Sequence, residues 1–333
     1  MTFSFGRPAW PVLIGAVTAL LVAACSSTSS TPSGGATTSS TQKSAGLEKT
    51  TITVGVLPVI DDAPLEIAIK NGYFTQQGLT VKTTPLVQST AAVPALLHQT
   101  VDIIGGGNYT SYIEGNAKGT YNISIVGMAT NCTEKNFQVL TLPGSGITSA
   151  KDLAGKTVAV NLTNNIQTLM LNAILKSEGV SGTPTYIAIP FPNMAAALKA
   201  HRVAAISVVE PFITATQKAD GAVPVTSECT GPVANYPLSG YFATASWVQQ
   251  NPNTLKAFQK AMTQAQTYAN ANPAAVRAIL PTYTKITAAA AQHVAIGTFP
   301  PSIDVTQLQA LADLMTQQGM ISGSFQVSKI IAP

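Results

Sequence analysis

The order of apolar and polar positions from residue 52 onward alternates between two periods. Runs rich in β-branched residues, such as ITVGVL (52–57) and VDIIGG (101–106), predict buried strands. Helix-period segments lie between them with start and stop signals, for example Asp62-Ala63-Pro64 before one helix and Gly72 after it. Strands that alternate with helices predict a mainly parallel sheet covered on both faces.

The second half of the chain repeats this plan. TVAVNL (157–162) predicts a strand, and Asn164 is placed to cap the helix after it. The halves align at a spacing of 102 positions, which sets Val101 on Val203. We interpret the repeat as two similar α/β lobes, although strand–helix units also resemble one another by chance.

Two extended stretches bracket the second half. FQVLTLP (137–143) and SGYFATASWV (239–248) are predicted to carry the chain into and out of the second lobe. The chain after Asn251 has mostly helical periodicity, and we expect these helices to pack on the first lobe. Residues 47–141 and 240–333 are therefore predicted to form lobe 1, and residues 142–239 lobe 2.

The start of the chain has the features of an export signal. Residues 1–24 contain one charge, Arg7, before an apolar run that is too short and interrupted to span a bilayer. The end, Val22-Ala23-Ala24-Cys25, resembles a bacterial lipobox and predicts lipidation of Cys25, unless an ordinary signal precedes a chance cysteine. Residues 25–46 are rich in Ser and Thr and predict a flexible tether. The protein is thus expected outside the cytoplasm, anchored to the cell membrane.

Composition narrows the chemistry. Charged residues are 10% of the chain, against about 25% in an average domain, and they form no basic stripe, which argues against nucleic-acid binding. The sequence has no cluster of His and Cys residues, so we expect no metal site and no cofactor. Cys132 and Cys229 both precede the predicted crossover stretches, which should lie side by side at a hinge. In an oxidising compartment they predict a disulfide, with two buried thiols as the alternative.

Several segments resemble one family. GYFTQQGLTV, ALLHQTVDI, SGITSAKDLAGKTVAV (145–160) and VVEPF (208–212) resemble the substrate-binding lipoproteins of ABC importers, in the nitrate, sulfonate, taurine and thiamine-precursor (SsuA/NMT1/THI5-like) group. Two turn positions depart from the family pattern: Gln99-Thr100 replaces the usual glycine, and Ala204 replaces an acid. The resemblance implies a type II periplasmic-binding-protein fold, with two α/β lobes joined by two crossover strands and a ligand cleft that closes by hinge motion.

Four loops at the carboxyl ends of strands are expected to line this cleft. Glycines 105–107 and the 161–165 loop precede helices, where backbone N–H groups suit sulfonate, phosphate or carboxylate. Acids in two loops suit an amine or an aminopyrimidine edge, and aromatic rings can stack on a flat ligand. Tight turns, helix caps and core packing are the structural alternatives. The candidate ligand-binding residues are Asp61, Asp62, Gly107, Asn108, Tyr109, Thr110, Asn161, Thr163, Asn164, Asn165, Phe191, Glu210 and Phe212.

The predicted function is capture of a small polar ligand and its delivery to an ABC permease by a monomeric, non-enzymatic binder. Arg202 and Arg277 are the only arginines after the signal, so an anion would be held by amides and hydroxyls. Taurine-like aminosulfonates and thiamine-precursor pyrimidines suit the acids, and nitrate suits them less. A ligand sensor without import, or a pyrimidine-synthase-like enzyme, are the alternatives. The enzyme of that type needs a Cys-rich segment that this chain lacks.

Overall fold

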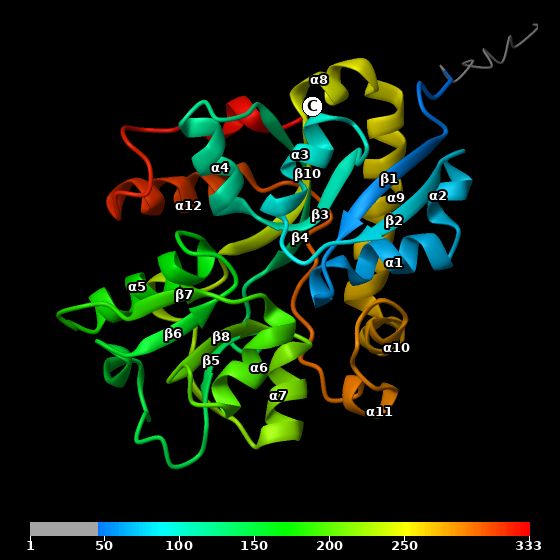
Figure 1. Cartoon of the computed structure of the whole chain (residues 1–333). Coiled ribbons are helices and arrows are strands. Elements are labelled where there is room, and N and C mark those ends of the chain that lie inside the picture. The colour runs from blue at the N-terminus through cyan, green and yellow to red at the C-terminus, as the bar shows by residue number, and fades with distance from the viewer. Residues whose placement is uncertain (1–45) are drawn as a thin grey trace, which may run out of the picture. The chain divides into compact units, whose positions relative to one another are not determined.

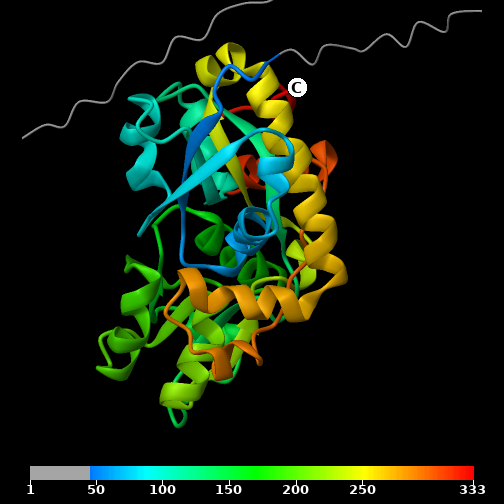
Figure 2. The ribbon, with the colours of Figure 1, turned by 90° about the vertical axis from the view of Figure 1, so that its right-hand side faces the viewer.

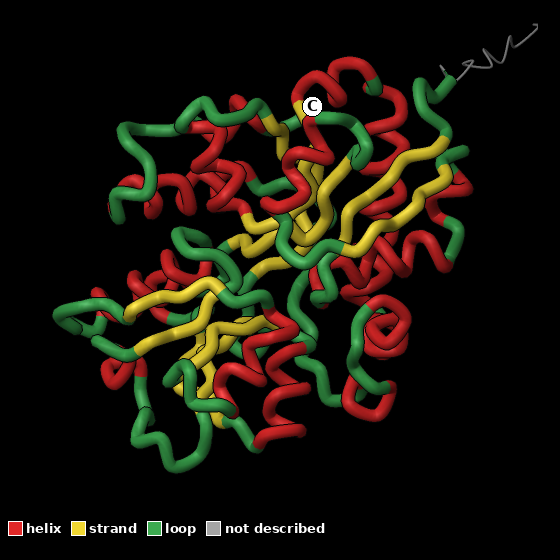
Figure 3. Tube along the Cα trace, viewed as in Figure 1, coloured by secondary structure: helices red, strands yellow, loops and turns green. Residues whose placement is uncertain are grey.

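The computed structural model describes residues 46–333, so the predicted signal, Cys25 and the tether before residue 46 lie outside the described part. Residues 46–333 form two α/β lobes, each built on its own five-stranded sheet (Figures 1 and 3). In this part of the chain, no helix combines the length and the apolar character that crossing a bilayer requires.

The first sheet has the strand order β2-β1-β3-β10-β4. Its strands are β1 (Thr51–Val56), β2 (Thr80–Pro85), β3 (Ile103–Asn108), β4 (Ile123–Asn131) and β10 (Pro237–Thr244). Strand β1 runs parallel to β2 and β3, whereas β10 runs antiparallel to β3 and β4. The helices of this lobe are α1 (Ala63–Lys70), α2 (Tyr73–Gln76), α3 (Val93–Leu97), α4 (Tyr109–Ala117), α8 (Ala245–Gln250), α9 (Pro252–Ala271), α10 (Pro273–Tyr283), α11 (Ala288–Ala291) and α12 (Val305–Gln317).

Helices cover both faces of the first sheet. On one face, Leu65 of α1 and Phe258 of α9 pack against Val54 of β1, and α9 runs along this side of the lobe in Figure 2. On the other face, Ile113 of α4 and Leu311 of α12 join the core around β3 and β10. The C-terminal helices thus pack on the first lobe, as the apolar stripe of α12 predicts.

The second sheet has the order β7-β6-β8-β5-β9. Its strands are β5 (Phe137–Thr141), β6 (Thr157–Val160), β7 (Thr185–Ala188), β8 (Ala205–Val209) and β9 (Val223–Ser227). Its longer helices are α5 (Ile166–Ser177), α6 (Phe191–Lys199) and α7 (Phe212–Asp220). The order matches that of the first sheet, with β5 in the place of β10, which supports the interpretation of the repeat as two similar lobes.

Matching backbone contacts support the similarity of the lobes and set Asp102 on Ala204 and Thr53 on Thr157. The Asp102 N–H donates to the Thr53 carbonyl at 2.8 Å, and the Ala204 N–H donates to the Thr157 carbonyl at 2.9 Å. The turns before these residues both hold a non-glycine residue in the left-handed region, Gln99 at φ 57° and His201 at φ 52°. The resemblance predicts glycine only in the first of these turns, but a non-glycine residue in this conformation costs some backbone strain in both lobes.

The sheets are mainly parallel, as the sequence predicts, but each also takes in one antiparallel strand that comes through the hinge, β10 in the first and β5 in the second. One sequence expectation needs correction. Strand β5, which the predicted boundary after residue 141 assigns to lobe 1, pairs with β8 and β9 of lobe 2. Alternating apolar residues predict that a strand is buried, but they do not identify the sheet that receives it.

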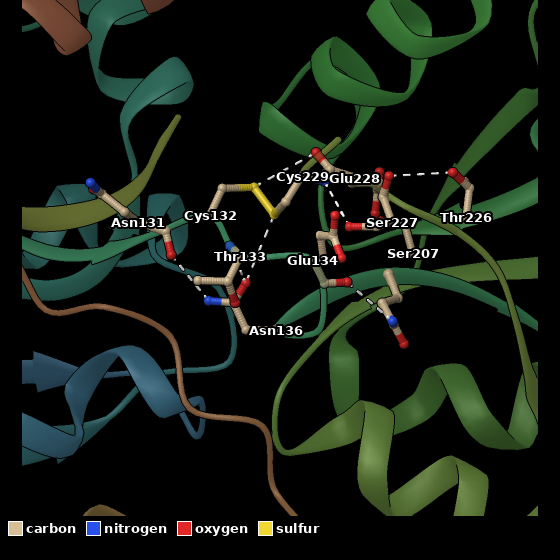
Figure 4. Close-up of a disulfide and its surroundings, with 11 residues drawn as sticks. Asn131, Cys132, Thr133, Glu134, Asn136, Ser207, Thr226, Ser227, Glu228 and Cys229 are labelled. Atoms are coloured by element: carbon tan, nitrogen blue, oxygen red, sulfur yellow. Dashed lines mark hydrogen bonds between the residues drawn. A yellow bond between two sulfur atoms is a disulfide. The ribbon is translucent and has the colours of Figure 1, made fainter. Parts of the chain in front are cut away.

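The chain crosses between the sheets at residues 132–136 and 228–236. At this hinge Cys132 and Cys229 form a disulfide, with Cα atoms 5.2 Å apart (Figure 4). The Asn136 side chain braces the first crossing, because its Oδ1 accepts the Thr133 N–H at 2.8 Å and its Nδ2 donates to the Asn131 carbonyl at 3.1 Å. The disulfide spans 97 positions, so its loop encloses the whole second sheet.

A buried carboxylate closes the amino end of the first sheet. Asp102 Oδ1 accepts from Lys49 Nζ at 2.5 Å and from the Trp247 indole Nε1 at 2.9 Å, and its Oδ2 accepts the Thr53 N–H at 2.8 Å. These bonds join the start of β1, the start of β3 and α8. Charge-assisted hydrogen bonds of this kind are the stronger ones in proteins, so this contact fixes the edge of lobe 1.

We predict that the double substitution Cys132→Ala/Cys229→Ala lowers the free energy of unfolding by about 2–4 kcal/mol, since the disulfide restricts a long loop in the unfolded chain. Urea unfolding followed by far-UV circular dichroism measures the change. Wild-type protein unfolded under reducing conditions is the control, because it loses the crosslink but keeps both cysteine side chains. A double variant as stable as the wild type would contradict the prediction.

Candidate functional site

A cavity of about 40 Å³ lies between the lobes, at the carboxyl ends of β1, β3, β6 and β8. Both lobes line it, as ligand sites in open α/β sheets usually require. Its apolar walls come from Leu57, Val59, Phe137, Ile166, Phe191, Val209 and Leu238. Its polar lining comes from Asp61, Ser89, Gly106, Asn108, Asn161, Asn165, Gln167 and Ser239.

Gln167 organises the lobe 2 side of the cavity. Its Oε1 accepts the Asn161 N–H at 2.6 Å and Asn165 Nδ2 at 2.9 Å, while its Nε2 donates to the Ser207 carbonyl at 2.6 Å and the Ser207 hydroxyl at 2.9 Å. The Ser207 hydroxyl in turn donates to Glu228 Oε2 at 2.5 Å. Burial raises the pKa of Glu228 to about 8. This network anchors the loop after β6 to the neighbouring strand and to the hinge.

Helix caps fix the asparagines of the site. Asn165 is the N-cap of α5 and accepts the Gln167 N–H at 3.0 Å. Asn108 is the N-cap of α4, where its Oδ1 accepts from the Ser111 N–H at 3.0 Å and the Thr110 hydroxyl at 2.7 Å. Because that oxygen is occupied, only the Asn108 amide nitrogen remains for a ligand. The predicted cap, Asn164, instead adopts a left-handed conformation with φ 54° one residue earlier.

Asp61 is the only acidic group that lines the cavity. Burial raises its pKa to about 6, although the hydroxyls of Ser239 and Thr130 hydrogen bond to it and oppose the shift. Those two hydroxyls also lie 3.0 Å apart. The carboxyl is 5% exposed, so its ionised form is poorly hydrated unless a donor enters the cavity.

Asp62 lies beneath the site rather than in it. Its Oδ2 accepts the Leu57 N–H at 2.9 Å, and its Oδ1 has no partner in the described structure. Burial raises its pKa well above the ordinary value, and the nearby charges of Asp61 and Glu66 add to the shift. The carboxyl packs against Gly105 and Gly106, where a Cβ atom would collide with it. Glycine at these positions therefore makes room for Asp62.

Direct contacts hold the two lobes together around the cavity. Gln88 Nε2 of lobe 1 donates to the Asn161 carbonyl of lobe 2 at 2.7 Å. The Ile60 N–H donates to the Glu210 carbonyl at 3.0 Å, and the Ala295 N–H donates to Glu210 Oε1 at 3.0 Å. The structure therefore represents a closed arrangement, with little space left between the lobes.

The predicted site residues divide into two groups. Asp61, Asn108, Asn161, Asn165 and Phe191 line the cavity. The others lie away from it: Asp62, Gly107, Tyr109, Thr110, Thr163, Asn164, Glu210 and Phe212.

Packing explains where this second group lies. The Tyr109 ring is buried edge-on against Phe242, with ring centroids 5.6 Å apart, and a Cβ at Gly107 would collide with that same Phe242 ring. Phe212 stacks behind Phe191, at 5.5 Å. Thr163 and Asn164 are exposed.

Glu210 and Thr110 form structural hydrogen bonds instead of lining the cavity. The Glu210 carboxylate accepts the Thr214 N–H at 3.1 Å and the Thr214 hydroxyl at 2.8 Å, in addition to the lobe contact. The Thr110 hydroxyl is used by the Asn108 cap. Both roles satisfy groups that would otherwise be buried without partners.

Sequence reasoning missed Ser89, Gln167 and Ser239, which all line the cavity. Gln167 lies two positions after the helix cap Asn165. This spacing predicts that Gln167 is near the site, but not that it makes the central hydrogen bonds. The sequence predicts Ser239 only as part of a crossover strand. Only the pairing of β10 with β3 places Ser239 at the cavity, because Ser239 then lies opposite Asn108.

The cavity offers two buried acceptors to a ligand. Asn161 Oδ1 is buried without a hydrogen-bond partner, and Asp61 supplies a second acceptor. Among the lining residues, all within the described part of the chain, none is Lys, Arg or His. Over residues 46–333 no group of three or more His, Cys, Asp or Glu side chains is placed to hold a metal ion. An N–H or ammonium donor is the natural complement of this site.

Comparisons with known proteins agree with this architecture. A curated relative, the nitrate/nitrite binding protein NrtA of Nostoc sp., is 23% identical over 248 residues, covering 66% of this chain and 54% of the relative, so the chain spans about half its length. The alkanesulfonate-binding protein SsuA of Xanthomonas axonopodis pv. citri, solved with MOPS, gives a TM-score of 0.72 at 17% identity over 86% of this chain and 99% of that one. The desulfurization enzyme DSZB gives 0.64 at 17% identity over 86% and 97%.

Two mixed-sheet α/β lobes with a cavity between them define a type II periplasmic-binding-protein fold, which these solved structures share. At such low identity the structural matches establish the fold alone. The family is established by sequence, because the NMT1/THI5-like profile matches residues 60–276. The chain therefore belongs to the NMT1/THI5-like family.

We predict that Asp61→Asn stabilises the ligand-free protein at pH 7.5 by about 1–3 kcal/mol. The pKa of Asp61 is raised to about 6 from an ordinary 3.8, so the folded state holds this proton more tightly. Stability therefore falls as pH rises through that interval, and the full penalty applies above pH 6. Asparagine mimics the neutral acid without this penalty.

Urea unfolding at pH 7.5 and pH 4 measures this effect, and the advantage of the variant should disappear at the lower pH. Asp313→Asn, at an exposed position, is the matched control. Equal stability of Asp61→Asn and wild type at both pH values would rule out an ionised, destabilising Asp61.

Proposed function

We propose that this protein is the substrate-binding component of an ABC importer for a small solute. The observation that carries the proposal is the cavity at the carboxyl ends of both sheets, lined by polar groups of both lobes. A ligand there contacts both lobes at once, so its binding energy favours the closed arrangement over the open one. The relatives named for nitrate and alkanesulfonate binding support the same class of function.

The ligand class follows from the cavity walls. A bare anion would face Asp61 and the free Asn161 oxygen without a cation to compensate, and burying it there would be costly. An ammonium group or an amino-substituted heterocycle supplies the missing donors. An aminosulfonate of the taurine type would add its anionic part at the Asn108 and Asn165 side of the cavity. An aminopyrimidine would place its ring against Phe191.

The lipoprotein assignment is part of the proposal. Residues 1–24 would direct export, lipidated Cys25 would hold the protein at the membrane, and residues 26–46 would be a spacer. A spacer of 21 residues with Gly/Ser-like flexibility has a root-mean-square reach of about 25 Å. That length would keep the folded lobes close to a permease in the same membrane.

We predict that a donor-bearing solute raises the melting temperature of the wild-type protein. A thermal-shift screen of taurine, ethanesulfonate, nitrate, amino acids and aminopyrimidines measures this. Taurine should exceed ethanesulfonate, because the two differ by the ammonium group that Asp61 would bind. For the solute that binds, Asp61→Asn and Asn161→Ala should each weaken affinity by about 1–3 kcal/mol, the cost of a lost or unsatisfied buried hydrogen bond.

Thr163→Ala is the matched control, since Thr163 is an exposed neighbour outside the cavity. Calorimetry should give this variant the wild-type affinity. A response to nitrate and ethanesulfonate alone would refute the donor-bearing ligand class. No response to any solute would oppose the binding function itself.

The fold is shared with the desulfurization enzyme DSZB, so an enzyme is the second candidate. The cavity provides Asp61 but no nucleophilic cysteine, histidine or basic residue among its lining side chains. A binder returns its ligand unchanged, so mass spectrometry after prolonged incubation distinguishes the two. Covalently altered solute in excess over protein would favour the enzyme.

A further inference from the structure

The two lobes differ at the ends of their sheets that lie away from the cleft. In lobe 1 the carboxylate of Asp102 closes this end by bonding to Lys49, Trp247 and the Thr53 N–H. In lobe 2 the equivalent position is Ala204, because its N–H makes to Thr157 the bond that Asp102 makes to Thr53. Alanine has no acceptor to offer to the Thr157 N–H.

A hollow of about 510 Å³ lies where the carboxylate is missing. Thr157 and Ala204 both line it, together with the basic residues Lys156, His201 and Arg202. No acidic residue lines it. The ion pairs among residues 46–333 are Lys49–Asp102, Lys118–Glu114 and Lys199–Asp220, so the cations of the hollow have no carboxylate partner there.

The lobes place these cations in similar ways. Lys49 lies two residues before β1, and Lys156 lies directly before β6. His201 and Arg202 form the left-handed turn that leads into β8, as Gln99 and Thr100 lead toward β3. Lobe 2 thus has more basic residues at this end of its sheet than lobe 1, but it lacks the acidic residue that lobe 1 has there. In a chain with only 10% charged residues, such a gathering is distinctive.

We propose that this hollow is a second binding site, which takes the carboxylate of an organic acid. The carboxylate would occupy the place that Asp102 fills in lobe 1, between the Lys156 and Arg202 side chains, where Arg can bind it with two parallel bonds. The apolar part of the acid would lie on Leu142, Ile147 and Leu198, which also line the hollow. Such walls favour an amphiphilic acid over inorganic phosphate.

This site is separate from the cleft. The hollow lies at the amino ends of β6 and β8, and the cavity between the lobes lies at their carboxyl ends. A solute bound in the hollow touches only lobe 2, so it does not require lobe closure. The proposal therefore does not depend on the function proposed for the cleft.

The test is titration of the ¹⁵N-labelled protein with hexanoate, followed by amide chemical shifts. We expect saturable shifts at Thr157, Arg202 and Ala204, while the amides of Asn161 and Asn165 stay unchanged. Hexylamine, with the same apolar body and the opposite charge, should give none. Lys156→Gln/Arg202→Gln should weaken binding about tenfold through the loss of two ion pairs. Lys218→Gln, an exposed cation elsewhere in lobe 2, should leave affinity unchanged.

Ala204→Asp tests the proposal directly, because it supplies at residue 204 the carboxylate that Asp102 supplies in lobe 1. The Asp variant should show no hexanoate shifts and should have a higher melting temperature than the wild type. Ala204→Asn, which supplies no charge, should have a smaller effect on both. The proposal is overturned if hexanoate gives no saturable shifts, if the shifts appear only at the cleft, or if they are equal in wild type and the Lys156→Gln/Arg202→Gln variant. Equal or tighter binding of inorganic phosphate would overturn the assignment to organic acids.

Discussion

Each sheet is completed by a strand that the chain brings in through the hinge, and most other features depend on this constraint. Strand β5 enters the second sheet beside β8, and β10 returns to the first sheet beside β3. Because both strands are buried in the middle of their sheets, the segments that precede them are held close together. That proximity places Cys132 and Cys229 within bonding distance. It also sets Ser239 of β10 next to Asn108 of β3, at the floor of the cavity.

The polar residues of the cleft oppose the stability of the fold. Asp61 and Asp62 are both buried at the end of β1 without a cation near them, and burial raises the pKa of each. Part of the cost is offset by the Leu57 N–H and by the hydroxyls around Asp61, but the Asn161 oxygen and one Asp62 oxygen stay unpaired. Sites that must bind a polar ligand commonly keep such unsatisfied groups, because a ligand that satisfies them gains affinity and selectivity. The unpaired acceptors therefore indicate the chemistry of the ligand better than the cavity volume indicates its size.

Local signals in the sequence were sufficient for the elements and for part of the site. Asn108 ends β3 and Asn165 lies in the loop after β6, so their place at the carboxyl edge of a sheet was predictable, although the sequence pointed to Asn164 as the cap of α5. Gln167 was not, since its partner Ser207 is 40 positions away and becomes adjacent only when β6 pairs with β8. The same limit explains β5, whose apolar pattern predicts burial equally well in either lobe. Glu210 and Tyr109 stand at strand ends like true ligand residues, but the lobe contact and the packing on Phe242 use them instead.

The closed arrangement also has consequences for how a ligand acts. A cavity of about 40 Å³ has room for roughly three water molecules, which is too small for an aminosulfonate or a pyrimidine. Such a ligand must enter with the lobes apart and hold them slightly further apart than they are here. The hydrogen bonds from the Ile60 N–H to the Glu210 carbonyl and from the Gln88 side chain to the Asn161 carbonyl supply closing contacts that need no ligand. A ligand therefore has to contribute more than contact with both lobes: it must satisfy Asp61 and Asn161 well enough to outweigh the loss or lengthening of those bonds. Under the proposed function, hydrogen-bond chemistry rather than size is therefore the basis on which the cleft would discriminate between solutes.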